Sequence, residues 1–250
     1  MLGAARGVFL ANAAPAAAAG VTFRTDSYAS NVYLAVPFDS THLMDDQSAE
    51  INASSTQATL TDGPASSNTT TQVKWTSSPN YVNAYEGDVG LGAANTYALS
   101  TSMPSCNSGS NTYVVEGWFY ANNATSNSNW CLSSADSGGR WLFGVNNGTT
   151  VSFGGENNIG IGSSGWVHMA IVLDAGTKRF YLDGVYKGAW YSTNTGFSTL
   201  HVGQFNASDP NDYRGHIQDL RVTIGSNRGY TGTSTSSANF TLPSSIVESF

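Results

Sequence analysis

The sequence is poor in charge and in cysteine. Only 11% of the 250 residues are charged, against roughly 25% in an average soluble protein. A nucleic-acid-binding protein needs a basic footprint that displaces counterions from phosphate, but 10 Lys and Arg face 17 Asp and Glu, a net charge of −7. This balance argues against nucleic acid and anionic membranes as partners. Two cysteines, Cys106 and Cys131, are too few for a disulfide-dense scaffold. They form either a single disulfide or two reduced thiols.

Small uncharged residues take the place of the missing charges. The chain has 33 serines, 25 threonines, 22 asparagines and 27 glycines, all of which are poor residues for a helix interior. Its 11 Phe, 12 Tyr and 6 Trp can still furnish a core, so the chain is not disordered. The composition excludes helical bundles and doubly wound nucleotide folds, and it predicts an all-β protein.

Short strands separated by Gly, Asn and Ser turns run from residue 31 to residue 250. This spacing predicts one domain, 31–250, built as a two-sheet antiparallel jelly-roll sandwich. Asp183-Gly184 and Asn147-Gly148 each predict a hairpin turn. Both alternating faces of 166–174 are apolar, which predicts a central strand, with His168 making a hydrogen bond in the core. The predicted strands are 32–38, 72–76, 113–121, 130–134, 141–145, 151–153, 166–174, 179–182, 185–190, 200–205 and 216–224.

Residues 1–30 differ in composition from the rest of the chain. Their start, MLGAARGVFLANAAPAAAAG, resembles a secretory signal, but Asn12 and Pro15 interrupt its apolar run. The uncharged run over 7–23 is too short to span a bilayer. We therefore expect neither a cleaved signal peptide nor a transmembrane segment. The prediction is an extended N-terminal arm that anchors the chain on a neighbouring subunit through Leu2, Arg6, Phe9 and Leu10.

Several motifs in order along the chain resemble a known family. The segment WVHMAIVLDAGTKRFYLDGVYKG is similar to the strand–turn–strand signature of LamG-like domains, in the concanavalin A-like lectin/glucanase superfamily. VYLAVPFDSTHLMDDQSAEI resembles that family's first strand and turn, and TYVVEGWFYA its strand before the sandwich core. RGHIQDLRVTIGSNRGYTG, then FTLPSS, resembles the closing tail of LamG-like domains in tailed-phage structural proteins, here Arg228, Tyr230, Phe240 and Pro243. The resemblance implies a jelly roll.

The sequence gives little support for catalysis. Retaining glycosidases of this superfamily need two carboxylates about 5 Å apart, on a strand patterned Glu-x-Asp-x-x-Glu. The nearest match begins at Glu86 and Asp88 and ends in Leu91, so its acid is missing. Glu116 has no carboxylate two or four residues away, and Ser134-x-Asp136 fits an Asp-box hairpin turn. We therefore predict a protein that is not an enzyme.

Two binding sites are weaker candidates. Sugars stack on aromatic rings while polar side chains bind their hydroxyls, which makes Trp190, Tyr191, Tyr213 and Tyr230 candidate glycan-binding residues. Oxygen ligands suit a hard cation, and calcium is the one possible cofactor. Its candidate ligands are Asn206, Asp209, Asn211 and Asp212, although such residues are also ordinary turn formers.

Two functions fit these observations. The first is a virion structural protein of a tailed phage, a capsid decoration or a head or tail appendage. Its arm would bind other virion proteins or copies of itself, and its jelly roll would face outward on the virion surface and hold host or environmental glycans weakly. The alternative is a soluble or surface carbohydrate-binding lectin module.

Overall fold

A computed structural model describes the chain in separate stretches. Backbone and side chains are described at 27–36, 101–103, 112–120, 151, 165–189, 199–203 and 216–242. For 61–62, 67–69, 84–86, 99–100, 121, 129–134, 140–146, 150, 152–153, 159–160, 190–191 and 215 only the backbone is described. Residues 1–26 of the predicted arm and the predicted strand 72–76 lie outside these residues, whereas residues 27–30 of the arm are described. Apart from one short 3-10 turn, η1 (Ala29–Asn31), the assigned elements are strands.

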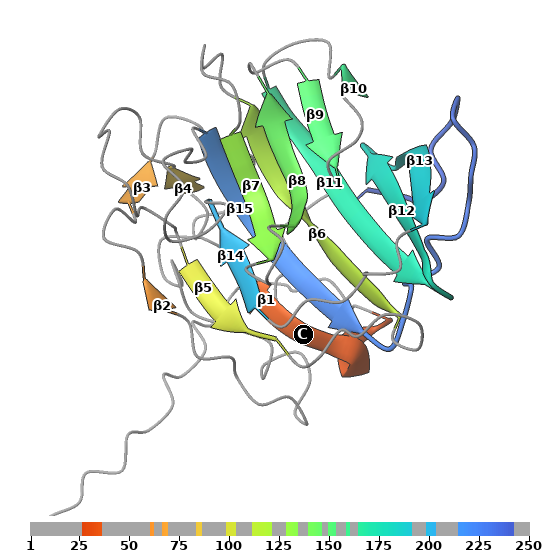
Figure 1. The fold of residues 1–250 in the computed structure, drawn as a ribbon, viewed down its shortest axis with the longest axis horizontal. Helices are drawn as coiled ribbons and strands as arrows, with labels where there is room; N and C mark the ends of the chain where they lie inside the picture. The colour runs from red at the N-terminus through yellow and green to blue at the C-terminus, as the bar shows by residue number, and fades with distance from the viewer. Residues whose placement is uncertain are drawn as a thin grey trace, which may run out of the picture.

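The strands form two antiparallel sheets that face each other (Figure 1). One sheet has eight strands in the order β13-β12-β11-β6-β15-β4-β3, and β1 also pairs with β15. The other has seven in the order β10-β9-β8-β7-β14-β5-β2. The first sheet contains β1 (Val32–Val36), β3 (Ser67–Thr69), β4 (Ala84–Glu86), β6 (Tyr113–Ala121), β11 (Gly165–Asp174), β12 (Thr177–Leu182), β13 (Val185–Tyr191) and β15 (Gly215–Ile224). The second contains β2 (Thr61–Asp62), β5 (Leu99–Ser102), β7 (Asn129–Ser134), β8 (Arg140–Asn146), β9 (Thr150–Phe153), β10 (Ile159–Gly160) and β14 (Thr199–Val202).

The main core lies between the sheets because alternate side chains of each strand point inward. On β6 these are Tyr113, Val115 and Phe119, which pack with Leu200 and Val202 of the opposite sheet. All five are fully buried. The predicted all-β sandwich is therefore confirmed.

The predictions for β11 and for the hairpins also hold. The predicted strand 200–205 is shorter in the structure, because β14 ends at Val202, and β2, β3, β4, β5 and β10 are not among the predicted strands. β11 lies between β6 and β12 and is buried along most of its length, as a central strand should be. The hairpin β12–β13 turns at Asp183 and Gly184, whose φ angles of 49° and 75° are those that a two-residue turn of this kind requires. β8 pairs in antiparallel fashion with β7 and with β9, as the other two hairpin predictions require.

A β-bulge interrupts β15 in the middle of the sheet. Between Gln218 and Arg221 the register with β6 shifts, and Asp219 takes a left-handed φ of 55°. The extra residue packs over Gly117, where an added Cβ would lie 3.3 Å from the carbonyl oxygen of Asp219. A one-residue shift exchanges the two faces of a strand. The bulge therefore returns Leu220 to the core and places Arg221 on the outer face of the sheet.

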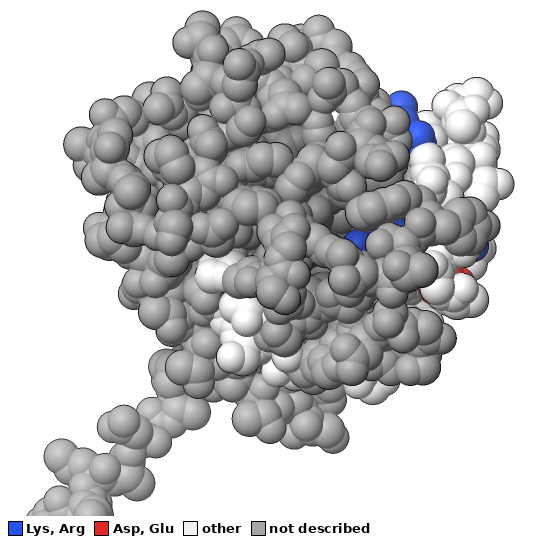
Figure 2. All heavy atoms as spheres, in the orientation of Figure 1, with Lys and Arg blue, Asp and Glu red and all other residues white. Residues whose placement is uncertain are grey.

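After β15 the chain crosses that outer face as an irregular segment, residues 226–242, here named the strap. It leaves the sheet where the amide of Gly225 donates to the carbonyl of Thr112 (2.7 Å). In Figure 1 the strap is the dark blue loop beside β12 and β13. Figure 2 shows mainly uncharged described atoms at this edge, in keeping with the sequence TGTSTSSANFTL at 231–242.

Candidate functional site

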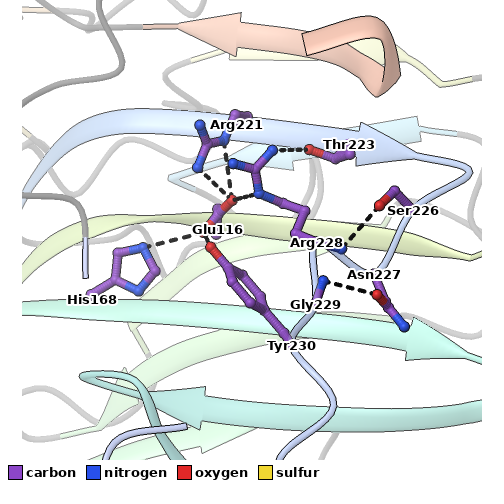
Figure 3. Close-up of polar contacts among 9 residues, drawn as sticks. All are labelled: Glu116, His168, Arg221, Thr223, Ser226, Asn227, Arg228, Gly229 and Tyr230. Carbon is purple, nitrogen blue, oxygen red and sulfur yellow. Dashed lines mark hydrogen bonds and ion pairs between the residues drawn. The ribbon is translucent and has the colours of Figure 1, made fainter. Parts of the chain in front are cut away.

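A buried carboxylate lies at the centre of the outer face of the eight-stranded sheet. Glu116, on β6, is 1% exposed. Its Oε1 accepts two hydrogen bonds from Arg221 of β15, from Nε at 3.1 Å and from NH2 at 2.7 Å. On its other side, Nε2 of His168, on β11, lies 3.4 Å from Oε2. The prediction that His168 makes a polar contact in the interior is confirmed, and Figure 3 shows the ring directed at the carboxylate.

The strap supplies the remaining partners of this carboxylate. Nε of Arg228 lies 3.0 Å from Oε1 of Glu116, and the hydroxyl of Tyr230 donates to Oε2 at 3.0 Å. NH1 of Arg228 also donates to the hydroxyl of Thr223 on β15 (3.3 Å). We call Glu116, His168, Arg221, Arg228 and Tyr230 the latch cluster, because it joins three strands to the strap (Figure 3).

The surroundings of Glu116 keep it ionised. Burial alone would raise the pKa of its carboxyl group, but the guanidiniums of Arg221 and Arg228 and the hydrogen bond from His168 outweigh burial and hold the pKa well below its usual value. The pKa of Tyr230 is shifted in the opposite direction. Burial, and then the negative charge of Glu116, raise the pKa of its phenol. The cluster therefore holds an ionised carboxylate beside a neutral phenol.

An aromatic cluster continues the contact between strap and sheet. Tyr230 stacks on Phe240, with ring centroids 3.7 Å apart, and Phe240 meets the ring of Tyr181 of β12 edge-on at 5.4 Å. The hydroxyl of Tyr181 donates to the strap carbonyls of Tyr230 (3.0 Å) and Gly232 (2.9 Å). Burial raises the pKa of this phenol, so it remains a donor. Apolar packing and hydrogen bonds thus hold the strap on the sheet together with the ion pairs.

The start of the domain closes over the same place. The ring of Tyr28 covers the guanidinium of Arg228, with the ring centroid 5.2 Å from its central carbon. The side-chain amide of Asn31 donates to the carbonyl of Ile224 (3.1 Å), at the end of β15. Residues 27–31 are therefore packed against the root of the strap.

Asn239 holds the far loop of the strap in shape. Its Nδ2 donates to the carbonyl of Ser234 (2.8 Å) and, at 3.3 Å each, to those of Ser237 and Gly184. Its Oδ1 accepts the amide of Ser234 at 2.8 Å. One side chain therefore ties the loop 234–239 to the β12–β13 turn.

Asn239→Asp should lower the free energy of unfolding by about 1–3 kcal/mol. The substitution keeps the acceptor but replaces the donor with a second oxygen, which then faces carbonyl oxygens. Urea unfolding followed by circular dichroism measures this. Ser236→Ala, an exposed change in the same loop, is the control and should cost less than about 0.5 kcal/mol. Equal effects of the two substitutions would contradict the bracing role of Asn239.

The latch cluster is built to hold charges still. General acid catalysis needs a carboxyl group that is protonated near the working pH, whereas Glu116 is held ionised, with five hydrogen-bond or ion-pair contacts to four side chains. In the described residues no group of three or more His, Cys, Asp or Glu is arranged to hold a metal ion. The arrangement joins the strap to the sheet.

The structure describes the predicted glycan residues only in part. Tyr230 is 7% exposed, its ring is stacked on Phe240, and its hydroxyl is bonded to Glu116. It is part of the interior and is not carried further as a sugar-stacking ring. Trp190 and Tyr191 are the last residues of β13 and pair with Lys178 and Thr177 at the start of β12. The side chains of Trp190 and Tyr191 lie outside the described residues. Tyr213, the calcium candidates Asn206, Asp209, Asn211 and Asp212, and the arm residues Leu2, Arg6, Phe9 and Leu10 lie outside them entirely.

The sequence carried a partial signal for the latch cluster. Alternation along β6 places Glu116 on the same face as Val114 and Trp118, and a charged residue in so apolar a strand needs a buried partner. The closing motif contains Arg228 and Tyr230, but their partner Glu116 is more than 100 positions earlier. No local pattern connects residues so far apart.

Comparison with known proteins places the chain in a family. Residues 91–224 match the Laminin_G_3 model, described as the concanavalin A-like lectin/glucanases superfamily. The match covers more than half of the chain, so the chain belongs to this family. Curated proteins include no sequence that matches it.

Solved structures give the same fold. The binding domain of botulinum neurotoxin serotype D superimposes with a TM-score of 0.52 at 13% identity, covering 79% of this chain and 49% of that one. The binding domain of botulinum neurotoxin DC in complex with SialylT gives 0.54 at 11%, covering 78% and 48%. A botulinum neurotoxin type C structure gives 0.53 at 11%, with the same coverage, and its description states that cell entry of the toxin depends on interaction with two ganglioside molecules. This chain spans about half the length of these structures, and at such identity the likeness shows the fold alone.

No helix among the described residues has the length and apolar character to cross a membrane.

Proposed function

We propose that the chain is a non-catalytic carbohydrate-binding module that presents glycan-binding loops on a rigid jelly roll. The observation that supports this most is the state of Glu116. Among the described residues, Glu116 is the one buried carboxylate on the outer face of the sheet that contacts two arginines. These arginines keep it ionised. Because its charge is used to hold the strap on the sheet, Glu116 is a structural group, and we place ligand binding in the loops.

The comparisons support the same proposal at the level of fold. The chain belongs to a superfamily described by its lectins and glucanases. Two structures of similar fold carry SialylT or gangliosides in their descriptions. A jelly roll of this kind can bind sugars. Binding measurements identify the ligand of this chain.

The test is a glycan array followed by calorimetry with the best ligand. We expect dissociation constants in the micromolar to millimolar range, and loss of binding in a Tyr213→Ala variant that still folds. Lys187→Ala, an exposed substitution on β13, is the control and should leave binding unchanged. A flat array with folded protein would remove the carbohydrate-binding proposal.

A role as a structural protein of a tailed-phage particle is the second candidate. The closing motif that resembles phage LamG-like domains includes Arg228, Tyr230 and Phe240, and all three are packed in the strap contact. In this role the predicted arm would join the domain to a neighbouring virion protein. The deletion that tests it should stop at residue 26, because Tyr28 packs on Arg228. We expect the deleted chain to fold and to fail to join particles. Normal incorporation would contradict anchoring.

A further inference from the structure

The described apolar side chains pack in two main groups, one on each side of the eight-stranded sheet. The group between the sheets, which includes Leu34, Phe119 and Leu200, contains no residue of the strap. The other group lies on the outer face, and the strap contributes Tyr230 and Phe240 to it. Its sheet residues are Val114, Ala170, Val172, Tyr181 and Tyr186. Removal of the strap from the sheet would therefore leave the packing between the sheets complete.

The backbone of the strap is only loosely integrated into the sheet. Residues 226–242 are assigned to no strand or helix, so they lack the row of backbone hydrogen bonds that holds a strand to its neighbour. The amide of Asn239 donates to the carbonyl of Gly184 in the β12–β13 turn (2.8 Å), and side chains make the other described contacts. A segment held in this way can open locally without separating any pair of strands.

Two guanidiniums, one on a strand and one on the strap, share the charge of Glu116. NH2 of Arg221 on β15 lies 2.7 Å from Oε1, and Nε of Arg228 lies 3.0 Å from the same oxygen. Among the described residues, His168 of β11 and Tyr230 of the strap also face this carboxylate, and β6 adds no other charged residue. Without the carboxylate charge both guanidiniums would be buried with no counter-charge, which is strongly destabilising. Arg221 is fixed in a strand, so the strap is the part that can carry its guanidinium into water.

We propose that the strap is an acid-released cover of the outer face of the eight-stranded sheet. When Glu116 takes up a proton, residues 226–242 leave the sheet as one unit while the sandwich stays folded, and Val114, Val172 and Tyr181 become exposed. The lowered pKa of Glu116 gives the sign. Because the open state lacks Arg228 beside the carboxylate, it binds the proton more readily. Closure is therefore complete above about pH 5 and is lost as the pH falls from about 4.3 toward the pKa of the closed state. This release does not depend on carbohydrate binding.

Residue-resolved hydrogen exchange on the full chain, measured by NMR between about pH 6 and about pH 2.5, tests the release. Protection factors relative to the intrinsic exchange rate remove the direct effect of pH on exchange. The bonded amides of Tyr230 and Asn239 report the strap, and those of Ile171 and Leu173 on β11 report the sandwich. We expect strap protection to fall about tenfold or more between pH 5 and pH 3 and to approach one at about pH 2.5. The β11 amides should stay at least about a hundredfold protected.

Glu116→Gln should show the released strap near neutral pH. The variant keeps the shape of the side chain and removes its charge, so at pH 6 the strap amides should be at least about a hundredfold less protected than in the wild type. They should change little further in acid. Tyr230→Phe keeps the stack on Phe240 and removes one hydrogen bond, so it should lower strap protection about tenfold. The wild-type pH series gives the answer by itself if Glu116→Gln does not fold.

Two other carboxylates near the strap provide matched controls. Oδ2 of Asp174 accepts a hydrogen bond from Nδ2 of Asn227 in the strap (3.0 Å), and Oδ1 of Asp183 accepts the amide of His168 (2.9 Å). Asp183 is exposed, and Asp174 is paired with the partly exposed Arg179. Asp174→Asn and Asp183→Asn keep a side-chain oxygen as the acceptor. Each should lower strap protection less than about fivefold and keep the pH dependence of the wild type.

Loss of protection in the strap and in β11 at the same pH would overturn the proposal, because the strap would then belong to the same cooperative unit as the sandwich. A strap that keeps its protection down to about pH 2.5 would overturn it as well. The same holds for an acid response that persists in Glu116→Gln and disappears in Asp174→Asn or Asp183→Asn.

Discussion

Glu116→Gln should lower the free energy of unfolding by about 3–5 kcal/mol, the cost of leaving a buried charge without its counter-charge. Gln has the same shape as Glu but no charge, and Arg221 and Arg228 stay buried beside it. The strap should loosen first, because Arg228 and Tyr230 belong to it. Urea unfolding gives the free energy, and amide hydrogen exchange over 226–242 reports the strap.

The control is a carboxylate with a surface ion pair. Asp174 lies 3.6 Å from NH1 of Arg179, and both side chains are partly exposed. Its Oδ2 also accepts a hydrogen bond from Nδ2 of Asn227 in the strap (3.0 Å), which the side-chain oxygen of an asparagine can still accept. Asp174→Asn should cost only about 0.2–1 kcal/mol. If Glu116→Gln cost no more than this control, the latch cluster would not be what holds the strap.

The same carboxylate predicts how stability depends on pH. Its pKa in the folded protein is lowered, whereas in the unfolded chain it is about 4.3. The unfolded state therefore binds a proton first, so the contribution of Glu116 to stability is complete above about pH 5 and is lost as the pH falls through the folded value. Unfolding free energies measured between pH 7 and pH 3 should fall more steeply for the wild type than for Glu116→Gln. Parallel curves would contradict the lowered pKa.

Tyr181→Ala should cost about 3–5 kcal/mol. This side chain is 0% exposed and lies between the sheet and the strap, where it contacts Tyr230 and Phe240 and donates to two strap carbonyls. Its removal leaves a cavity and unpaired carbonyl groups together. Thermal and urea unfolding measure the loss.

Tyr181→Phe separates the two contributions. It keeps the ring and removes the hydroxyl, so the loss should be about 1–3 kcal/mol for the unpaired carbonyls. A Phe variant as unstable as the Ala variant would show that the hydrogen bonds, and not the packing of the ring, hold the strap. An Ala variant as stable as the wild type would show that the strap contact contributes nothing.

Local patterns determined the fold class and most of the strands. Alternation of apolar residues, which has the period of a strand, gave the bounds of β6 to the residue and those of β11 to within one, and Asp183-Gly184 gave the turn of the β12–β13 hairpin. These features depend on residues close together in the chain, where backbone preferences and the two faces of a strand act directly. The ordered motifs gave the family in the same way.

The bulge in β15 could not be predicted from local patterns. Strict alternation from His216 would point Arg221 into the apolar core. The left-handed residue Asp219 corrects the register, and the space for it exists because β6 has a glycine at position 117. Neither strand shows this by itself, because the fit depends on the pairing of the two.

The sequence by itself determined an all-β, weakly acidic jelly roll with few charges, and the turns that build it. Only the tertiary structure decided the roles of its polar residues. It joined Glu116 to Arg228 and Tyr230 across more than 100 positions, turned Tyr230 from a candidate glycan ring into a buried one, and set Trp166, Tyr120 and His216 in one row. The physical reason is that burial and charge pairing depend on which strands become neighbours, and that order is fixed by the packing of the whole sandwich.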